Sequence, residues 1–120
     1  MSIIFIILAA ICNALMDVLS TRYDISIFRN SKFDWFLDWR ISWKNKWQNG
    51  NIRNGERFFL SSTWLVFLTD GWHLAKSLML AFISLAIIFY KPIFGNLDIF
   101  LFCIVWGIVF EVFYNKILVK

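Results

Sequence analysis

The chain has 120 residues, of which 60% are hydrophobic and 20% aromatic, and its formal net charge is +4 at pH 7. Soluble domains are only about 45–50% apolar, so this composition excludes an ordinary soluble domain. It predicts a single all-α domain in the membrane, over residues 1–120.

Three transmembrane helices are predicted from the apolar runs. Runs without any charge occur at 1–16, 77–90 and 99–110. Each is shorter than the roughly 20 residues that a spanning helix needs, so charged residues must lie inside the spans. We predict spans over about 1–19, 71–90 and 99–118. The first of them lacks the basic start of a signal peptide.

Positive charge sets the predicted orientation. Eight Lys and Arg residues lie between Thr21 and Arg57, whereas the loop 91–97 has only Lys91. Basic loops stay in the cytoplasm. We therefore expect loop 21–57 and the C-terminus inside and the N-terminus outside, in a bacterial-type inner or plasma membrane. The basic excess then faces anionic lipid head groups, and we expect no nucleic-acid partner because no binding module is recognised.

The first span has one polar face. Asn13 and Asp17 are four residues apart and share a side of the helix, with two alanines one turn earlier. Small residues let a neighbouring helix approach closely, so this face is predicted to point into the protein. Cys12 and Cys103 lie in apolar runs and are interpreted as packing residues.

The cytoplasmic loop is rich in tryptophan. Apolar residues alternate from 33 to 47, which is typical of a strand. A tryptophan also recurs every fourth residue, as in a helix: Trp35, Trp39, Trp43 and Trp47. We favour a short interfacial helix near 33–40, followed by irregular chain to Arg57, with the indole rings at the level of the head groups.

Four basic residues near two turns are candidates for binding a head-group phosphate: Lys44, Lys46, Arg53 and Arg57. The turn signals are Asn49-Gly50 and Asn54-Gly55, where backbone N–H groups can also face an anion. No Walker or dinucleotide pattern is present, so the alternative is plain turns that carry the positive charge of a cytoplasmic loop.

The stretch 58–90 is too long for one spanning helix, since it would rise roughly 50 Å against a hydrocarbon core of roughly 30 Å. Asp70 is a good N-cap residue and Gly71 a weak helix former, so the break is placed there. We expect a separate short helix over 58–69, re-entrant or interfacial, and a second span that ends before Pro92.

The third span also has a polar face. Glu111 and Asn115 are four residues apart, and Gly107 lies one turn earlier. Asn96 or Asp98 can cap the start of this helix.

The polar residues of the three spans reach similar depths in the cytoplasmic half. Counting along the helices predicts one level for Asn13, Lys76 and Glu111, and a shallower level for Asp17, His73 and Asn115. An unpaired ionisable group inside a bilayer costs several kcal/mol. We therefore predict one shared polar pocket.

A divalent metal is the first candidate occupant of this pocket. The predicted ligands are Asp17, Asp70, His73 and Glu111, whose donor atoms suit such a cation. Asp70-x-x-His73 places a carboxylate and an imidazole on one helical face, as in metal sites of helix bundles.

Two metal-free interpretations stand beside it. In one, the polar groups form a structural hydrogen-bond network in which Lys76 neutralises Glu111. In the other, a carboxylate orients His73 for acid–base chemistry. The candidate catalytic residues are His73, Asp70 and Lys76, with Asn13 and Asn115 as supporting polar groups.

The predicted function is that of a metal-dependent enzyme acting on a lipid or isoprenoid head group at the cytoplasmic interface. The alternative is a non-catalytic accessory subunit or a holin-like pore former, whose polar faces are buried in a homo-oligomer. Ion translocation is disfavoured, because the stretch 77–90 offers only Ser77 and Ser84 as polar lining.

Overall fold

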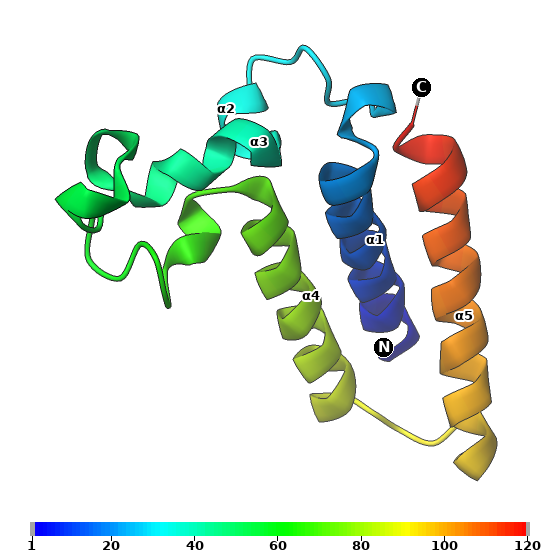
Figure 1. Cartoon of the computed structure of the whole chain (residues 1–120). Coiled ribbons are helices and arrows are strands. Elements are labelled where there is room, and N and C mark those ends of the chain that lie inside the picture. Colours follow the sequence, from blue (N-terminus) through cyan, green and yellow to red (C-terminus); the bar gives the residue numbers. More distant parts are fainter. Residues whose placement is uncertain (1, 120) are drawn as a thin grey trace.

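Three long helices form the membrane part of the protein, seen here in a computed structural model that describes residues 2–119. They are α1 (Ser2–Thr21), α4 (Gly71–Ile88) and α5 (Asp98–Val112), and α5 continues as the π-helix η7 (Phe113–Ile117). All three are long and apolar enough to cross a membrane when α5 is taken with its flanking turns. Residues 2–119 contain isolated β-bridges but no strand (Figure 1). The prediction of an all-α protein with three spans is confirmed, and the chain is a small membrane protein.

Helix α1 is the centre of the bundle. It lies between α4 and α5 and packs against both (Figure 1). Of its apolar span 44% is buried, against 17% for α4 and 6% for α5. Ala9, Ala10 and Ala14 are fully buried in α1, where small side chains allow neighbouring helices to come close. The molecule is flat, with extents of 53 × 34 × 17 Å.

Helix α4 begins where the sequence predicts. Asp70 has extended backbone angles (φ −153°, ψ 159°), and its side chain accepts a hydrogen bond from the backbone N–H of His73 at 2.8 Å. This is the N-cap arrangement that satisfies a free donor of the first helical turn.

Asp98 acts differently from its predicted role as a cap. It is the first residue of α5, and its carboxylate accepts hydrogen bonds from the loop that precedes it. The donors are the backbone N–H groups of Ile93 (3.0 Å) and Phe94 (2.8 Å) and the hydroxyl of Tyr90 (2.6 Å). Asp98 therefore closes the α4–α5 connection instead of capping its own helix.

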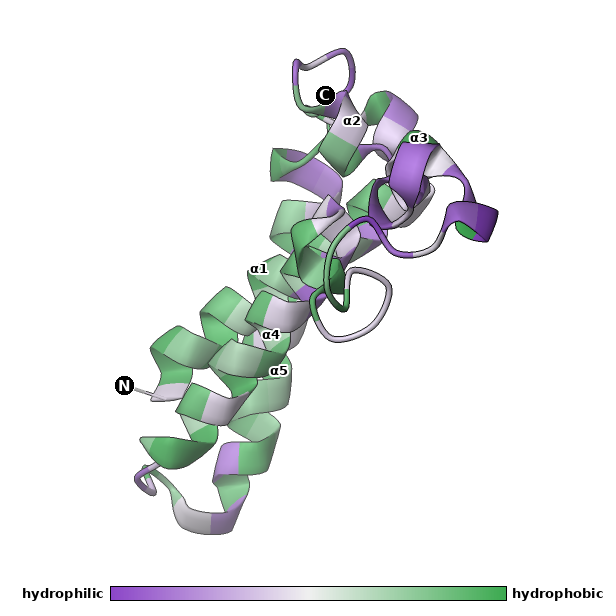
Figure 2. Ribbon diagram, turned by 90° about the vertical axis from the view of Figure 1, so that its left-hand side faces the viewer, coloured by the Kyte–Doolittle hydropathy of each residue, from purple (hydrophilic) through white to green (hydrophobic). Residues whose placement is uncertain are grey.

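The lateral arm, residues 34–69, leaves the bundle at the end where the C-terminus lies (Figure 1). Its elements are α2 (Asp34–Leu37), α3 (Trp39–Ser42) and the 3-10 helices η2 (Trp43–Lys46), η3 (Gln48–Gly50), η4 (Ile52–Asn54) and η5 (Val66–Leu68). The 3-10 helix η1 (Tyr23–Ile25) comes between α1 and the arm. Figure 2 shows that hydrophilic residues gather in the arm and hydrophobic ones along the bundle.

The helix predicted near 33–40 is present as the two short helices α2 and α3. Asp38 separates them with φ −79° and ψ 109°, and its side chain caps α3 by accepting from the backbone N–H of Arg40 at 3.0 Å. Irregular chain and short 3-10 turns follow, as the sequence indicates.

The helix expected over 58–69 is not formed there, where the structure has turns and only η5 is helical. The side chain of Glu56 binds the backbone N–H of Leu60 and the hydroxyl of Ser62, and the hydroxyl of Ser61 donates to the carbonyl of Lys46. Leu60 has φ of 60°. Side-chain bonds of this kind offer the backbone an alternative to the helix.

Candidate functional site

A carboxylate and an imidazole meet at the start of α4. The Nδ1 atom of His73 lies 2.7 Å from Oδ2 of Asp70, while Oδ1 of the same carboxylate caps the helix. The side chain of Asp70 is 7% exposed and that of His73 32% exposed. The N-cap geometry therefore fixes Asp70, and Asp70 in turn orients the ring of His73. We call this pair the dyad.

The dyad lines a recess of about 270 Å³ between the bundle and the arm. The other lining residues come from the end of α1, from α3, from η2 and from α4: Ser20, Trp39, Ser42, Trp43, Lys46 and Trp72. The recess thus combines one cationic side chain and one histidine with a wall of three indole rings.

The arrangement has a definite chemical capacity. With a proton on Nδ1, His73 donates to Asp70, which leaves Nε2 available to accept or donate a proton. Lys46 supplies a positive charge suited to a phosphate. Indole rings prefer the boundary between hydrocarbon and water. The recess therefore has the components for holding an anionic amphiphile next to an acid–base group.

The arm is held over this recess by polar contacts. The side-chain amide of Asn45 donates to the carbonyls of Trp35 (2.7 Å) and Thr69 (2.9 Å), which joins η2 to α2 and to the residue before the dyad. Arg40 pairs with Asp38 at 3.0 Å and with Asp24 at 2.9 Å. The Arg40 guanidinium lowers the pKa of Asp38 below its ordinary value, so this pairing is present at neutral pH.

The predicted metal ligands do not come together. Among residues 2–119, no three His, Cys, Asp or Glu side chains form a group that could hold a metal ion. The structure joins Asp70 to His73 but adds neither Asp17 nor Glu111, which stand on α1 and α5. A divalent cation here remains a prediction from the sequence.

Lys76 and Glu111 do not form the predicted ion pair in the described part of the chain. The ammonium of Lys76 lies 5.3 Å from the ring centroid of Trp72, and Glu111 accepts a hydrogen bond from the side-chain amide of Asn115 at 2.7 Å. The reason is the order of the helices, since α1 lies between α4 and α5 (Figure 1).

Asn115 also links α5 to the end of α1. Its side-chain oxygen accepts from Nη1 of Arg22 at 2.7 Å, and the Arg22 guanidinium lies 4.1 Å from the ring centroid of Tyr114. Arg22, Asn115 and Glu111 thus form a network apart from the dyad. Asn13 and Asp17 are half-buried in α1.

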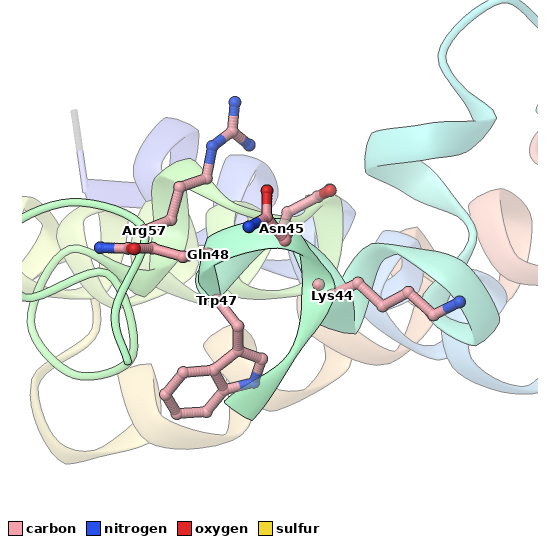
Figure 3. Close-up of a pocket in the computed structure, with 7 residues that line it drawn as sticks. Lys44, Asn45, Trp47, Gln48 and Arg57 are labelled. Carbon is pink, nitrogen blue, oxygen red and sulfur yellow. The ribbon is translucent and has the colours of Figure 1, made fainter. Parts of the chain in front are cut away.

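The structure does not bring the four predicted head-group residues together. Lys44 and Arg57 line a second cavity of about 450 Å³ in the arm, together with Trp47 and Gln48. Figure 3 shows the ammonium of Lys44 and the guanidinium of Arg57 pointing in different directions. Lys46 lines the dyad recess instead, and Arg53 is exposed in η4. The geometry therefore favours Lys46 over the other three for contact with a ligand.

Sequence reasoning missed three residues of the recess. Trp72 is adjacent to His73 and could have been found from that position. Ser20 and Ser42 carry no sequence signal, because Ser20 of α1 and Ser42 of α3 are distant in the sequence and both line the recess only in the folded chain.

No family model matches the chain, and no curated protein or solved structure is similar to it.

Proposed function

We propose that the protein binds a phosphate-bearing lipid head group in the dyad recess, on the cytoplasmic side of the membrane, where His73 exchanges a proton with the bound lipid. The observation that carries the proposal is the 2.7 Å contact between His73 and Asp70 in a recess shared with Lys46. A carboxylate that orients an imidazole is a recurring arrangement for acid–base chemistry.

The position of the recess supports a lipid ligand. It lies at the first turns of the candidate span α4, and three of its lining residues are tryptophans. A ligand that enters there meets apolar surface for its glycerol or acyl part and charge for its phosphate. The basic arm fits an anionic cytoplasmic leaflet.

Binding is tested with a short-chain phosphatidylglycerol and the purified full-length protein in detergent. Because Trp39, Trp43 and Trp72 line the recess, their fluorescence is expected to change in a saturable manner. His73→Gln and Lys46→Gln are expected to weaken binding about tenfold each, since a hydrogen bond to a charged group contributes about 1.5–3 kcal/mol.

Lys44→Gln is the matched control. Lys44 is also a lysine of η2, but its ammonium lies 5.6 Å from the ring centroid of Trp43 and its side chain lines the other cavity. Its substitution is expected to leave the affinity unchanged. If the wild type, His73→Gln and Lys46→Gln bind the lipid with equal affinity, the recess is not the binding site.

A non-catalytic oligomer is the second candidate, supported by the exposure of α5. Only 6% of its apolar span is buried, Ile104 and Ile108 are about 60% exposed, and Glu111 stands on the same side. Cys103 is exposed and Cys12 buried. Oxidation in membranes is then expected to give a disulfide dimer that Cys103→Ser abolishes, whereas a monomer gives none.

A further inference from the structure

Two aromatic side chains of the arm are almost fully exposed. Trp64 is 82% and Phe59 79% exposed, and Phe58 adds a third aromatic ring at 36%. We call residues 58–64 the aromatic loop. Exposed apolar groups gathered on one segment mark a surface that meets a partner or a membrane.

Three of the seven backbone N–H groups of this loop, those of Leu60, Ser61 and Thr63, are hydrogen-bonded within the arm. The N–H of Leu60 donates to the Glu56 carboxylate at 3.1 Å, and the N–H of Ser61 donates to the carbonyl of Phe58 at 3.0 Å. The N–H groups of Thr63 (3.2 Å) and Leu65 (2.9 Å) both donate to the carbonyl of Leu60. These bonds fold residues 58–65 into a turn on the arm.

Ser61 also fixes the loop to the rest of the arm. The hydroxyl of Ser61 donates to the carbonyl of Lys46 at 2.6 Å and accepts from the backbone N–H of Arg57 at 3.1 Å. Ser61 itself is fully buried. The loop is therefore fixed to the arm at the buried Ser61, while the side chains of Phe59 and Trp64 are exposed.

The position of the aromatic loop relative to α4 favours lipid as its partner. In Figures 1 and 2, which share a vertical axis, the chain between η4 and η5 descends from the arm to the level of the first turns of α4. Those turns belong to a candidate span. The basic residues Lys46, Arg53 and Arg57 stay on the arm that carries the loop. Exposed aromatic rings on the loop and positive charges on the arm that carries it suit the apolar and head-group layers of a lipid leaflet.

We propose that the aromatic loop inserts Phe59 and Trp64 into the cytoplasmic lipid leaflet beside α4, as an anchor separate from the three spans. The anchor fixes the arm to the membrane surface at a second point. It does not rest on the dyad recess binding a ligand.

The test uses the full-length protein with Cys12→Ser and Cys103→Ser in vesicles of phosphatidylcholine and phosphatidylglycerol. Phe59→Cys, and separately Trp64→Cys, is labelled with the environment-sensitive fluorophore NBD. Both labels are expected to show blue-shifted emission and quenching by lipids that carry a nitroxide near the carbonyl. The control is Arg53→Cys, an exposed position on η4 of the same arm, where solvent-like emission is expected.

Three outcomes overturn the proposal. Emission from positions 59 and 64 that equals that from position 53 would place the loop in water. Shielding from aqueous iodide without quenching by nitroxide lipids would assign the aromatic loop to a protein partner or to a second copy of the chain. Quenching that is strongest with a nitroxide at the end of the acyl chain would make the loop a deeply re-entrant element. The label at position 64 keeps the test decisive if the Phe59→Cys protein does not fold.

Discussion

Asp70 has two roles that separate substitutions can distinguish. Its Oδ1 atom caps α4 and its Oδ2 atom meets the imidazole of His73. Asn is as good an N-cap as Asp, whereas Ala is poor. Asp70→Asn therefore keeps the cap and removes the carboxylate, and Asp70→Ala removes both.

The expected results differ in stability and in activity. Asp70→Ala is expected to lower the free energy of unfolding by about 1 kcal/mol, measured by denaturant titration in detergent, and Asp70→Asn to change it little. Both are expected to reduce any conversion of phospholipid substrate by about 100-fold, measured by mass spectrometry of the lipids. A stable Asp70→Asn protein with the wild-type lipid profile would contradict the acid–base role.

The dyad was predictable because it is local. Asp70 and His73 are three residues apart, so a helix that starts at Gly71 brings them together whatever surrounds it. The wider pocket was not predictable. Depth along each helix gives the level of a residue, but it does not tell which helix stands in the middle or how each one is rotated. Lys76 and Glu111 share a predicted level, but they belong to α4 and α5, and α1 lies between these two helices (Figure 1).

Among the elements, the junction of α4 with the arm depends on Gly71, the first residue of α4. A Cβ atom on Gly71 would lie 2.6 Å from Cδ2 of Leu37, 3.3 Å from Cδ1 of Leu19 and 3.5 Å from Cα of Leu37. Overpacking of this kind costs about 1–3 kcal/mol. Gly71→Ala is therefore expected to lower the thermal unfolding temperature in detergent.

Gly107→Ala is the matched control in α5, since a Cβ atom there meets nothing within 4 Å. Alanine is favoured over glycine within a helix by about 1 kcal/mol, so this variant is expected to be as stable as the wild type or more so. A loss of stability in Gly107→Ala that exceeds the loss in Gly71→Ala would show that the exposed face of α5 is covered in the folded protein.

The sequence predicts some of the secondary-structure elements correctly and others not. The spans and the start of α4 follow from apolar length and from one capping residue, and both are found in the structure. The prediction of a helix over 58–69 was wrong, because the Glu56 carboxylate accepts from the backbone N–H of Leu60 and the hydroxyl of Ser62. The hydroxyl of Ser61 donates to the carbonyl of Lys46 in η2. These bonds form only because of the path that the chain takes after η4. That path could not be predicted from a local sequence pattern.

At the scale of the whole molecule, the charge distribution makes a prediction about orientation. The arm and the C-terminus lie at one end of the bundle and the α4–α5 loop at the other (Figure 1). In a Cys12→Ser and Cys103→Ser background, Arg53→Cys is expected to react with a membrane-impermeant thiol reagent only after cell lysis. Asn96→Cys is expected to react in intact cells. If Arg53→Cys reacts in intact cells and Asn96→Cys reacts only after lysis, the orientation of the protein is the opposite of the predicted one.

The central place of α1 has a consequence for how the protein is made. Helix α1 is synthesised before α4 and α5, and each of them packs on α1. Each later helix can thus meet its partner as soon as it enters the bilayer, without waiting for the next one. A ribosome that stops after α4 leaves two paired spans with the polar arm between them already synthesised. Assembly can proceed one helix at a time, in the order of the sequence.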